Sequence, residues 1–324
     1  MLRPFLFACP ARLWHLGNMD KVGKYEIKKT LLKTGFSDIY IGYDPDLEIN
    51  VAVKVFHPKG DNVGKKATYG PAFWRARFIE EPKVLAGLDH PNIINVLFMD
   101  KTEDDDPYFV MPFIEANLIY EIGEDADTKE KIEELEPFWR PKSVAPRRAF
   151  DVWRQILSAL AALHDQDLVH RDIKPPNILL TSKKNGRVKL CDFGMVKVPG
   201  AEGSRSGIWI GTLDYISPEQ RRSAKDVTAA ADVYSAAALM YRMLTGRLAK
   251  GIRAPLRGGR FGLSDEVIGL IESCLKKRAA DRPQSAGEVI KALDKYVPDI
   301  NILPNTSKLP RRAAATRVIT KKIS

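Results

Sequence analysis

The sequence predicts an α+β protein in which a small, sheet-rich lobe precedes a larger, helical lobe. From Tyr25 to Val55, short alternating and β-branched runs (YEIKKTLL, DIYIGYD, INVAVKVF) are separated by turn residues, which indicates antiparallel strands. From Phe150 onwards, apolar residues recur at spacings of three and four, the pattern of helices with one buried face. A length of 324 residues accommodates one two-lobed domain or two ordinary ones, at roughly 100–200 residues per domain.

Between and after these strands, the other elements can be assigned in chain order. Residues 72–88 are predicted to form a helix, and PYFVMPFI at 107–114 a further strand. The stretch 120–136 is rich in acidic residues without a clear apolar stripe, so we expect a solvated helix or loop insert. Helical patterns then dominate up to Val297, as in ADVYSAAALMYRML and DEVIGLIESCL. The predicted parts are an N-terminal extension (1–24), the small lobe (25–113), the large lobe (114–300, with an acidic insert at about 120–145) and a basic tail (301–324).

The composition is that of a soluble globular protein, with 44% hydrophobic and 28% charged residues. Cys9, Cys191 and Cys274 share no close spacing, so neither a disulfide framework nor a zinc site is indicated, and a reducing cytoplasm is the expected location. No apolar run approaches the roughly 18 residues that a membrane span needs. Residues 1–18 make a poor signal peptide, and we expect an upstream extension or a mis-assigned start before Met19.

The net charge of +10 is concentrated at the two ends of the chain. Residues 301–324 carry six basic residues and no acid, and residues 1–18 carry two, so that about +2 remains for residues 19–300. We expect solvated, flexible ends, and keep a nucleic-acid-binding protein as a less favoured alternative. Binding of that kind would weaken steeply with added salt, because it depends on counterion release from phosphates.

Four short motifs occur in order along the chain. VAVK lies at 51–54, VHRDIKPPNILL at 169–180, CDFG at 191–194 and GTLDYISPEQ at 211–220. Each string alone has a sizeable false-positive rate, but together they strongly resemble the signature set of the protein kinase superfamily, across roughly residues 25–297. GTLDYISPEQ is most similar to the eukaryotic-like serine/threonine kinases of bacteria. The resemblance implies a two-lobed protein-kinase-like fold and transfer of the γ-phosphoryl group of ATP to protein hydroxyls.

Phosphoryl transfer needs positive charge on the phosphates, oxygen ligands for a divalent cation, and a carboxylate that orients the attacking hydroxyl. The resemblance implies that Lys54 holds the α- and β-phosphates and is itself held by Glu81 from the following helix. Asp172 would accept the proton of the substrate hydroxyl, and Lys174 would steady the γ-phosphate. The implied cofactors are ATP and Mg²⁺, with Mn²⁺ as the alternative metal. The implied metal ligands are Asp192 and Asn177.

The helix glutamate is chosen by spacing. EPKVLAGLDHPN at 81–92 fits the usual distance of the family from that glutamate to HPN, which favours Glu81 over Glu80. Pro82 is unusual inside a helix, because its ring clashes with the preceding turn. An alternative to the helix at 72–88 is therefore a short helix that begins near Glu81, in which case the pairing of Lys54 with this glutamate stays open.

The resemblance also predicts a nucleotide-base site. Ala52 and Leu179 are expected to sandwich the adenine, with Met111 behind it. The chain from Pro112 to Ile114, through Phe113, is expected to offer backbone hydrogen bonds to the base.

The stretch LLKTGFSDIY corresponds to the glycine-rich loop of the family but lacks its pattern. Leu32, Thr34 and Ser37 stand where the three glycines would be, and glycine there permits close approach of the backbone to phosphate. Small polar side chains allow part of this, so hydroxyl contacts are expected from Thr34 and Ser37, and packing on the adenine from Leu32. Gly35, at a variable position, and Ile39 complete the predicted contacts of the loop.

Two functions remain open within this fold. An active serine/threonine kinase with a weakened or differently held nucleotide is favoured, because the loop is a lid and not a source of catalytic charge. The alternative is a pseudokinase, an ATP-independent docking module. Pseudokinases commonly lose the equivalents of Lys54, Asp172 or Asp192, and all three are present here.

Two groups of residues are expected to support the architecture. Asp232 in ADVYS resembles the aspartate that anchors the catalytic loop, and His170 is expected to be structural. Glu219 resembles the partner of Arg282 in a buried ion pair, the loss of which costs on the order of 3–5 kcal/mol.

The expected partners are ATP and a protein substrate with a serine or threonine acceptor, the class implied by Lys174 together with Thr212. A phosphate on Ser204 or Ser206 would pair with Arg171 and order that segment. Thr316, in the tail, is a further candidate site of autophosphorylation.

Overall fold

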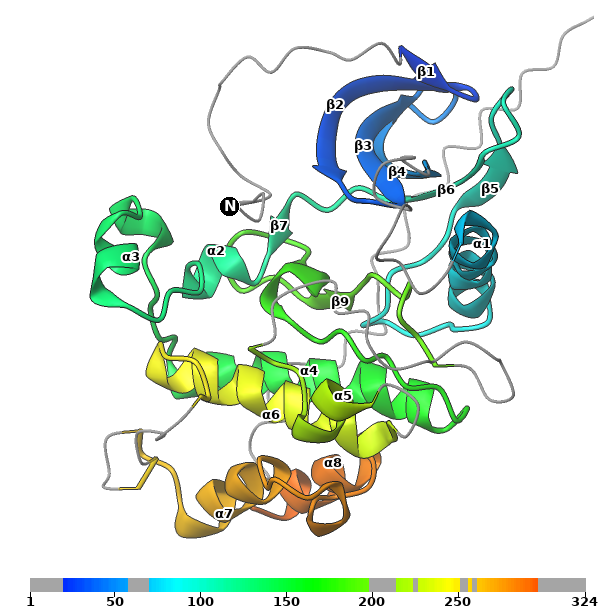
Figure 1. Ribbon diagram of the computed structural model, residues 1–324. Coiled ribbons are helices and arrows are strands. Elements are labelled where there is room, and N and C mark those ends of the chain that lie inside the picture. The colour runs from blue at the N-terminus through cyan, green and yellow to red at the C-terminus, as the bar shows by residue number, and fades with distance from the viewer. Residues whose placement is uncertain are drawn as a thin grey trace, which may run out of the picture.

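A computed structural model describes residues 20–57, 70–197, 214–223, 227–250, 256–257 and 261–296 of the chain. A curled sheet with helix α1 beside it forms the upper lobe, and a larger set of helices forms the lower lobe (Figure 1). The predicted two-lobed α+β fold is therefore confirmed. Thr212 and the candidate phosphorylation sites Ser204, Ser206 and Thr316 lie outside the described residues, as do both charged ends.

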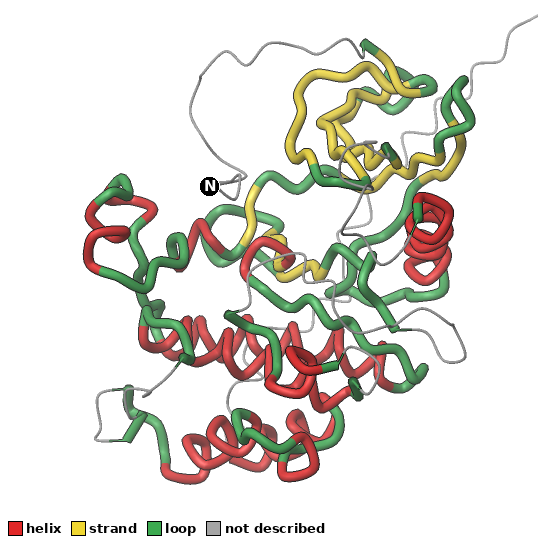
Figure 2. Tube along the Cα trace, viewed as in Figure 1, coloured by secondary structure: helices red, strands yellow, loops and turns green. Residues whose placement is uncertain are grey.

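The small lobe is built on one antiparallel sheet of six strands in the order β1-β2-β3-β4-β6-β5. The β-branched run INVAVKVF forms β4 in the middle of this sheet, where Val51, Val53 and Val55 are buried against the neighbouring strands. Figure 2 shows that most of the strands lie in this lobe. The strands are β1 (Lys21–Val22), β2 (Tyr25–Lys33), β3 (Ser37–Asp44), β4 (Ile49–Phe56), β5 (Phe98–Lys101) and β6 (Pro107–Pro112).

Helix α1 runs from Pro71 to Ala86, so the prediction of a long helix at 72–88 is confirmed and the short helix beginning near Glu81 is wrong. Pro82 lies inside this helix, in a position that forfeits a backbone hydrogen bond and costs about 3 kcal/mol in an ordinary helix. The buried side chains of Trp74, Phe78, Pro82 and Leu85 offset that cost, because they pack the helix against the lobe.

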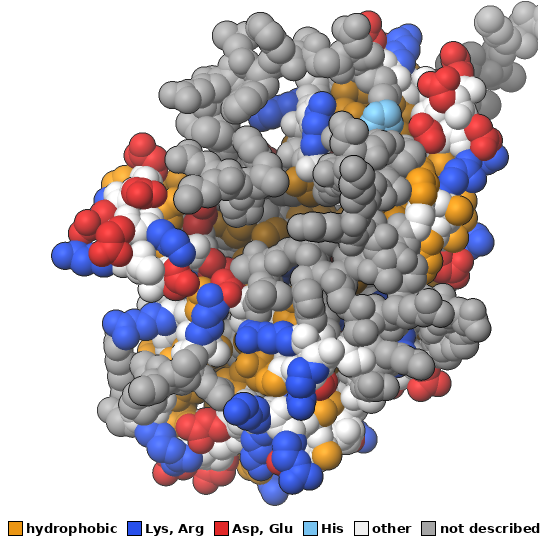
Figure 3. Space-filling view, viewed as in Figure 1, with side chains coloured by type: hydrophobic (Ala, Val, Ile, Leu, Met, Phe, Trp, Pro, Cys, Tyr) orange, Lys and Arg blue, Asp and Glu red, His pale blue; other side chains and the backbone are white. Residues whose placement is uncertain are grey.

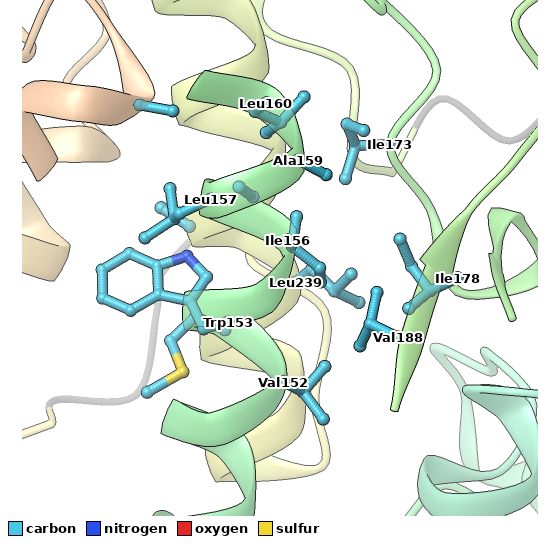
Figure 4. Packing of buried hydrophobic residues seen from close by; sticks show 14 of the residues in the cluster. Val152, Trp153, Ile156, Leu157, Ala159, Leu160, Ile173, Ile178, Val188 and Leu239 are labelled. Carbon is cyan, nitrogen blue, oxygen red and sulfur yellow. The ribbon is translucent and has the colours of Figure 1, made fainter. Parts of the chain in front are cut away.

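The large lobe is organised around α4 (Pro146–His164) and α6 (Ala229–Thr245), which pack against each other in the main hydrophobic core. Figure 4 shows side chains of α4, among them Ile156, close to Leu239 of α6 and to Ile178 and Val188 of a small sheet. All four side chains are completely buried. The helices are α2 (Ile119–Ile122), α3 (Lys129–Glu133), α4 (Pro146–His164), α5 (Pro218–Arg222), α6 (Ala229–Thr245), α7 (Asp265–Cys274) and α8 (Ala286–Tyr296), with 3-10 turns η1 (Pro137–Trp139), η2 (Pro175–Asn177) and η3 (Ala279–Asp281).

A second, three-stranded sheet was not predicted from the sequence. Its strands are β7 (Ala116–Asn117), β8 (Ile178–Leu180) and β9 (Val188–Leu190), which are too short to display an alternating pattern. The antiparallel pairing of β8 with β9 brings the start of one next to the end of the other, and the Cys191 amide donates to the Asn177 carbonyl at 3.0 Å. This sheet therefore sets the two predicted metal ligands, Asn177 and Asp192, side by side.

The acidic stretch folds into short elements, α2, α3 and η1, instead of one helix. As expected for a solvated segment, α3 has no buried residue. In the part of the chain that the structure describes, none of the helices has the length and apolar character to cross a membrane.

Candidate active site

Lys54 is the point where the two lobes meet. It projects from β4, and its Nζ donates to Glu81 Oε1 and Oε2 of α1 at 2.8 and 2.7 Å and to Asp192 Oδ1 of the large lobe at 3.3 Å. Burial opposes the charge of this lysine, but the two carboxylates outweigh it and raise the pKa of Lys54. The amide of Phe193 also donates to Glu81 Oε1, at 3.2 Å. The pair between Lys54 and Glu81, which Pro82 left open in the sequence, is therefore formed.

The catalytic loop, residues 169–177, brings three polar side chains together. Lys174 Nζ donates to Asp172 Oδ2 at 2.8 Å, and the Asn177 side-chain amide donates to the same oxygen at 2.9 Å and to the Asp172 carbonyl at 2.8 Å. Burial disfavours the charged lysine, whereas the neighbouring carboxylates of Asp172 and Asp192 favour it and raise the pKa of Lys174. One carboxylate oxygen of Asp172 is thus fixed by two donors.

The backbone of this loop is held by Asp232, a fully buried residue of α6. Its Oδ2 accepts from the His170 amide and its Oδ1 from the Arg171 amide, both at 2.8 Å, and His164 Nε2 lies 3.1 Å from Oδ2. Arg171 has a φ of +67°, a conformation that costs a non-glycine residue free energy. The expected anchoring role of Asp232 matches these bonds, since they keep the strained backbone in place.

Asp192 shows the same combination of strain and charge. Its φ is +63°, and its carboxylate faces two lysines. Desolvation works against ionisation here, but Lys54 and Lys174 together lower the pKa of Asp192, which keeps it a carboxylate at neutral pH. His170, fully buried, packs its ring edge-to-face on Phe193, with 4.8 Å between the ring centroids, which fits its expected structural role.

The turn between β2 and β3 is closed by its own side chains. Thr34 Oγ1 donates to the Ser37 carbonyl at 2.7 Å and accepts from the Ser37 amide at 2.9 Å. Phe36, at the tip, stacks on Trp74 of α1 with 4.1 Å between ring centroids. The threonine hydroxyl, expected from the sequence to contact phosphate, is therefore engaged within the turn.

The residues expected around the adenine come from both lobes. Ala52 of β4 pairs with Met111 of β6, whereas Leu179 belongs to β8 of the large lobe. Ala52 and Leu179 are buried, whereas Met111 and the remaining predicted positions are partly exposed. The remaining predicted positions are Leu32 and Ile39, which are register partners in β2 and β3, Gly35 in the turn, and Phe113 and Ile114 in the connection between the lobes.

Three further side chains, Arg282, Gln220 and Arg77, hold the segments that follow the catalytic loop. Arg282 forms a bidentate ion pair with Glu219 of α5 at 2.7 Å for each contact, the pair expected from the sequence. Gln220 Nε2 donates to the Arg171 carbonyl at 2.7 Å, and Arg77 of α1 donates to the Gly194 and Val196 carbonyls. Gln220 and Arg77 were not identified from the sequence, since neither lies in a motif that signals such a contact.

Comparison with known proteins supports one family. Residues 25–293 match the family described as protein kinase domain. The chain is 30% identical over 292 residues to serine/threonine-protein kinase pkn2 of Myxococcus xanthus, covering 84% of this chain and 32% of that protein. It is 31% identical to serine/threonine-protein kinase PrkC of Bacillus subtilis (70% of this chain, 31% of that protein) and to PknB of Mycolicibacterium smegmatis (69% and 32%). The chain spans about a third of the length of these relatives. On this match and on the geometry above, the chain belongs to the protein kinase domain family.

Proposed function

We propose that this protein is a serine/threonine protein kinase that transfers the γ-phosphoryl group of Mg-ATP to hydroxyls of proteins, itself included. The observation that carries the proposal is the convergence of Lys54, Asp172 and Asp192 from the two lobes, with the lysine paired to Glu81. These contacts supply the charge, the metal ligand and the carboxylate that phosphoryl transfer requires.

The donor set fits Mg²⁺. Asp192 offers a carboxylate and Asn177 an amide oxygen, and hard cations prefer such ligands. Within the described residues, no three His, Cys, Asp or Glu side chains form a group that could hold a metal ion, so Asp192 and Asn177 would hold Mg²⁺ together with water and the phosphate oxygens of ATP. When bound, Mg²⁺ would neutralise the charge that develops on those oxygens. Mn²⁺ accepts the same oxygen ligands and stays the alternative metal.

The side chains of the loop account for the transfer itself. Asp172 Oδ2 is occupied by Lys174 and Asn177, so Oδ1 is the oxygen that orients the substrate hydroxyl and accepts its proton. The hydroxyl oxygen then bonds to the γ-phosphorus as the bond to ADP breaks. Lys174, kept charged by its neighbours, offers a fixed positive charge to the phosphoryl group during transfer. Lys54 holds the α- and β-phosphates in line.

The serine/threonine class rests on Lys174 in the loop and on the names of the relatives, all of them serine/threonine kinases. The pseudokinase alternative gains no support, because each residue whose loss marks such proteins is present and ion-paired.

Autophosphorylation at Ser204 or Ser206 is part of the proposal. Arg171 and Arg77 both donate to carbonyls of residues 194–196, and burial together with the repulsion of Arg77 lowers the pKa of Arg171 to about 10. A phosphate is the kind of group that relieves repulsion between two arginines. The doubly substituted protein Ser204→Ala/Ser206→Ala should lose phosphate from this segment and part of its activity. Unchanged phosphate content there would refute this site.

The activity is tested by transfer of labelled γ-phosphate from Mg-ATP to the protein itself and to a generic basic protein. Asp172→Ala should lower the rate by about 10²–10⁴ through loss of the proton acceptor. Lys54→Met should abolish productive phosphate positioning. Asp172→Ala should keep the wild-type melting profile within a few degrees, whereas Lys54→Met leaves the buried carboxylate of Glu81 without its partner and should melt earlier, so it is assayed below its own melting transition. Phosphoserine or phosphothreonine that vanishes in both variants supports the proposal. No transfer by folded wild-type protein at any ATP concentration, also after treatment with an upstream kinase, would favour the pseudokinase.

A further inference from the structure

Asp125, in the acidic segment between α2 and α3, connects three distant parts of the chain. Its Oδ1 accepts from Arg242 Nε of α6 at 2.8 Å, and its Oδ2 accepts from the hydroxyl of Tyr215 at 2.8 Å. Figure 3 shows acidic side chains gathered at the α3 end of the molecule. Asp125 differs from a solvated acid of that surface, because both of its carboxylate oxygens are engaged by buried partners.

The first of these partners fixes the acidic segment to the large lobe. The Arg242 side chain is 1% exposed, and besides Asp125 its guanidinium donates to the carbonyls of Ile122, Gly123 and Lys142. Gly123 has a φ of +74°, and a Cβ at this position would lie 2.1 Å from the Arg140 carbonyl oxygen. The backbone at the start of the segment is therefore held in a conformation that only glycine permits.

The second partner ties this anchored segment to residues 214–222. Tyr215 is 2% exposed, and burial together with the charge of Asp125 raises its pKa well above the ordinary value, so the phenol stays protonated and donates. The neighbouring Asp214 forms an ion pair with Lys250, which also lies 3.7 Å from Asp127 of the acidic segment. Two adjacent residues thus connect to the same insert.

The hydrogen bond between Tyr215 and Asp125 matters for catalysis because residues 214–222 also contact the catalytic loop. Gln220 of α5 donates to the carbonyl of Arg171, the residue directly before Asp172. Residues 214–222 therefore contact the catalytic loop directly beside Asp172, the residue to which a substrate chain would present its hydroxyl. The nucleotide, in contrast, would contact Lys54 and Asp192, to which none of the bonds described for residues 214–222 leads.

We propose that Asp125 is a positioning residue for the protein substrate: through Tyr215 it holds residues 214–222 in the place where the substrate chain docks. This inference rests on the proposed kinase function and assigns a role in it to the acidic insert. The insert acts on binding of the protein substrate and not on binding of ATP.

The test is Tyr215→Phe, which removes only the hydroxyl and leaves the Asp125–Arg242 pair intact. kcat/KM for a generic basic protein substrate should fall about tenfold, the size expected for one hydrogen bond to a charged group, while KM for ATP stays within twofold of wild type. Tyr296→Phe, at a surface tyrosine, is the matched control and should behave as wild type. Asp125→Asn should show the same split between the two substrates, with a larger loss.

Unchanged kinetics of Tyr215→Phe with the protein substrate would overturn the inference. So would an equal loss for ATP and protein substrate, since that reports general destabilisation. Amide hydrogen exchange of residues 214–222, compared between wild type and Tyr215→Phe, tests the contact without requiring kinase activity. If wild type transfers no phosphate, the kinase function is refuted and the substrate role of Asp125 with it. Equal exchange in wild type and Tyr215→Phe would show that the Tyr215–Asp125 hydrogen bond does not hold residues 214–222.

Discussion

The catalytic loop and the β2–β3 turn are proposed to act on the same nucleotide, but they are stabilised in different ways. The loop is held from a distance: Asp232 and Gln220 contact it from positions far along the chain. The turn is held locally, by Thr34 bonding to Ser37 three residues away and by the stack of Phe36 on Trp74. The first region contains the polar residues His170, Asp172 and Asn177 of its motif, and the second has Leu32, Thr34 and Ser37 at the positions where the resemblance expects glycines.

The difference shows which function tolerates substitution. Catalytic charge must be placed within a fraction of an ångström, so the groups that place it cannot be exchanged. A lid only has to cover the phosphates, and a turn that closes itself with a threonine can do so. None of the residues 32–37, all of which the structure describes, has a φ in the left-handed region, so this turn does not need glycine for its backbone conformation.

The largest effect on activity is expected when the distant support of the loop is broken. Asp232→Asn replaces one of the two carboxylate oxygens by a donor that faces a backbone amide of His170 or Arg171. A buried amide left without an acceptor costs about 1–3 kcal/mol of stability, and displacement of the loop should lower kcat on the order of 10²-fold. Urea unfolding and steady-state phosphotransfer measure the two effects.

Asp104→Asn, at an exposed loop aspartate, is the control for this substitution and should leave both quantities unchanged. If Asp232→Asn keeps wild-type kcat, the long-range anchoring of the loop is not what places Asp172.

The next effect concerns the ion pair that fixes α5. Arg282→Met leaves the carboxylate of Glu219 without its partner and should lower the free energy of unfolding by about 3–5 kcal/mol, whereas adding Glu219→Gln should restore part of it. Burial opposes the charge of Glu219, but the bonds from Arg282 prevail and lower the pKa of Glu219 from its ordinary value. Urea unfolding of the three proteins at neutral pH measures the difference.

The lowered pKa fixes the pH dependence of this difference. A carboxyl group with a lowered pKa in the folded state stabilises the protein above its unfolded pKa, and that contribution is lost as the pH falls through the folded pKa. The difference in free energy of unfolding between wild type and Arg282→Met should therefore have its full size above the ordinary glutamate pKa of roughly 4.3 and should become smaller in stronger acid. A gap independent of pH down to unfolding would mean that the arginine stabilises through packing alone.

The sequence predicted the two-lobed fold and the residues that meet at Lys54, because each stands in a contiguous motif whose chemistry and spacing are recognisable. It did not identify Asp125, Gln220 or Arg77, since a contact between positions about 50 to 120 residues apart leaves no local pattern. Pro82 suggested a short helix through a local rule, which the packing of the buried face of α1 overrides. The strands β7, β8 and β9 were missed because two or three residues show no periodicity.

A smaller effect is expected at the tip of the turn. Phe36→Ala removes the stack on Trp74, an interaction worth about 0.5–1.5 kcal/mol, and frees the lid from α1. KM for ATP should rise roughly two- to tenfold with kcat and the KM of the protein substrate unchanged, as measured by initial rates at varied ATP. Phe138→Ala, at an exposed aromatic far from this turn in sequence, is the control. A fall in kcat alone would mean that the stack positions Glu81 and not the lid.

The smallest effect tests whether the β2–β3 turn binds the nucleotide less well because it lacks glycines. Thr34→Gly restores a glycine at a position where the family has one, yet it also removes the hydroxyl that bonds to the Ser37 carbonyl and amide. Because the backbone here does not require glycine, we expect the lost bonds to decide the outcome, with KM for ATP rising about twofold, on the scale of one net hydrogen bond. Thr34→Ser keeps the hydroxyl and should match wild type. A lower KM for ATP in Thr34→Gly would show instead that the missing glycines weaken nucleotide binding. The catalytic loop and the β2–β3 turn would then differ only in how strongly substitutions in each reduce activity.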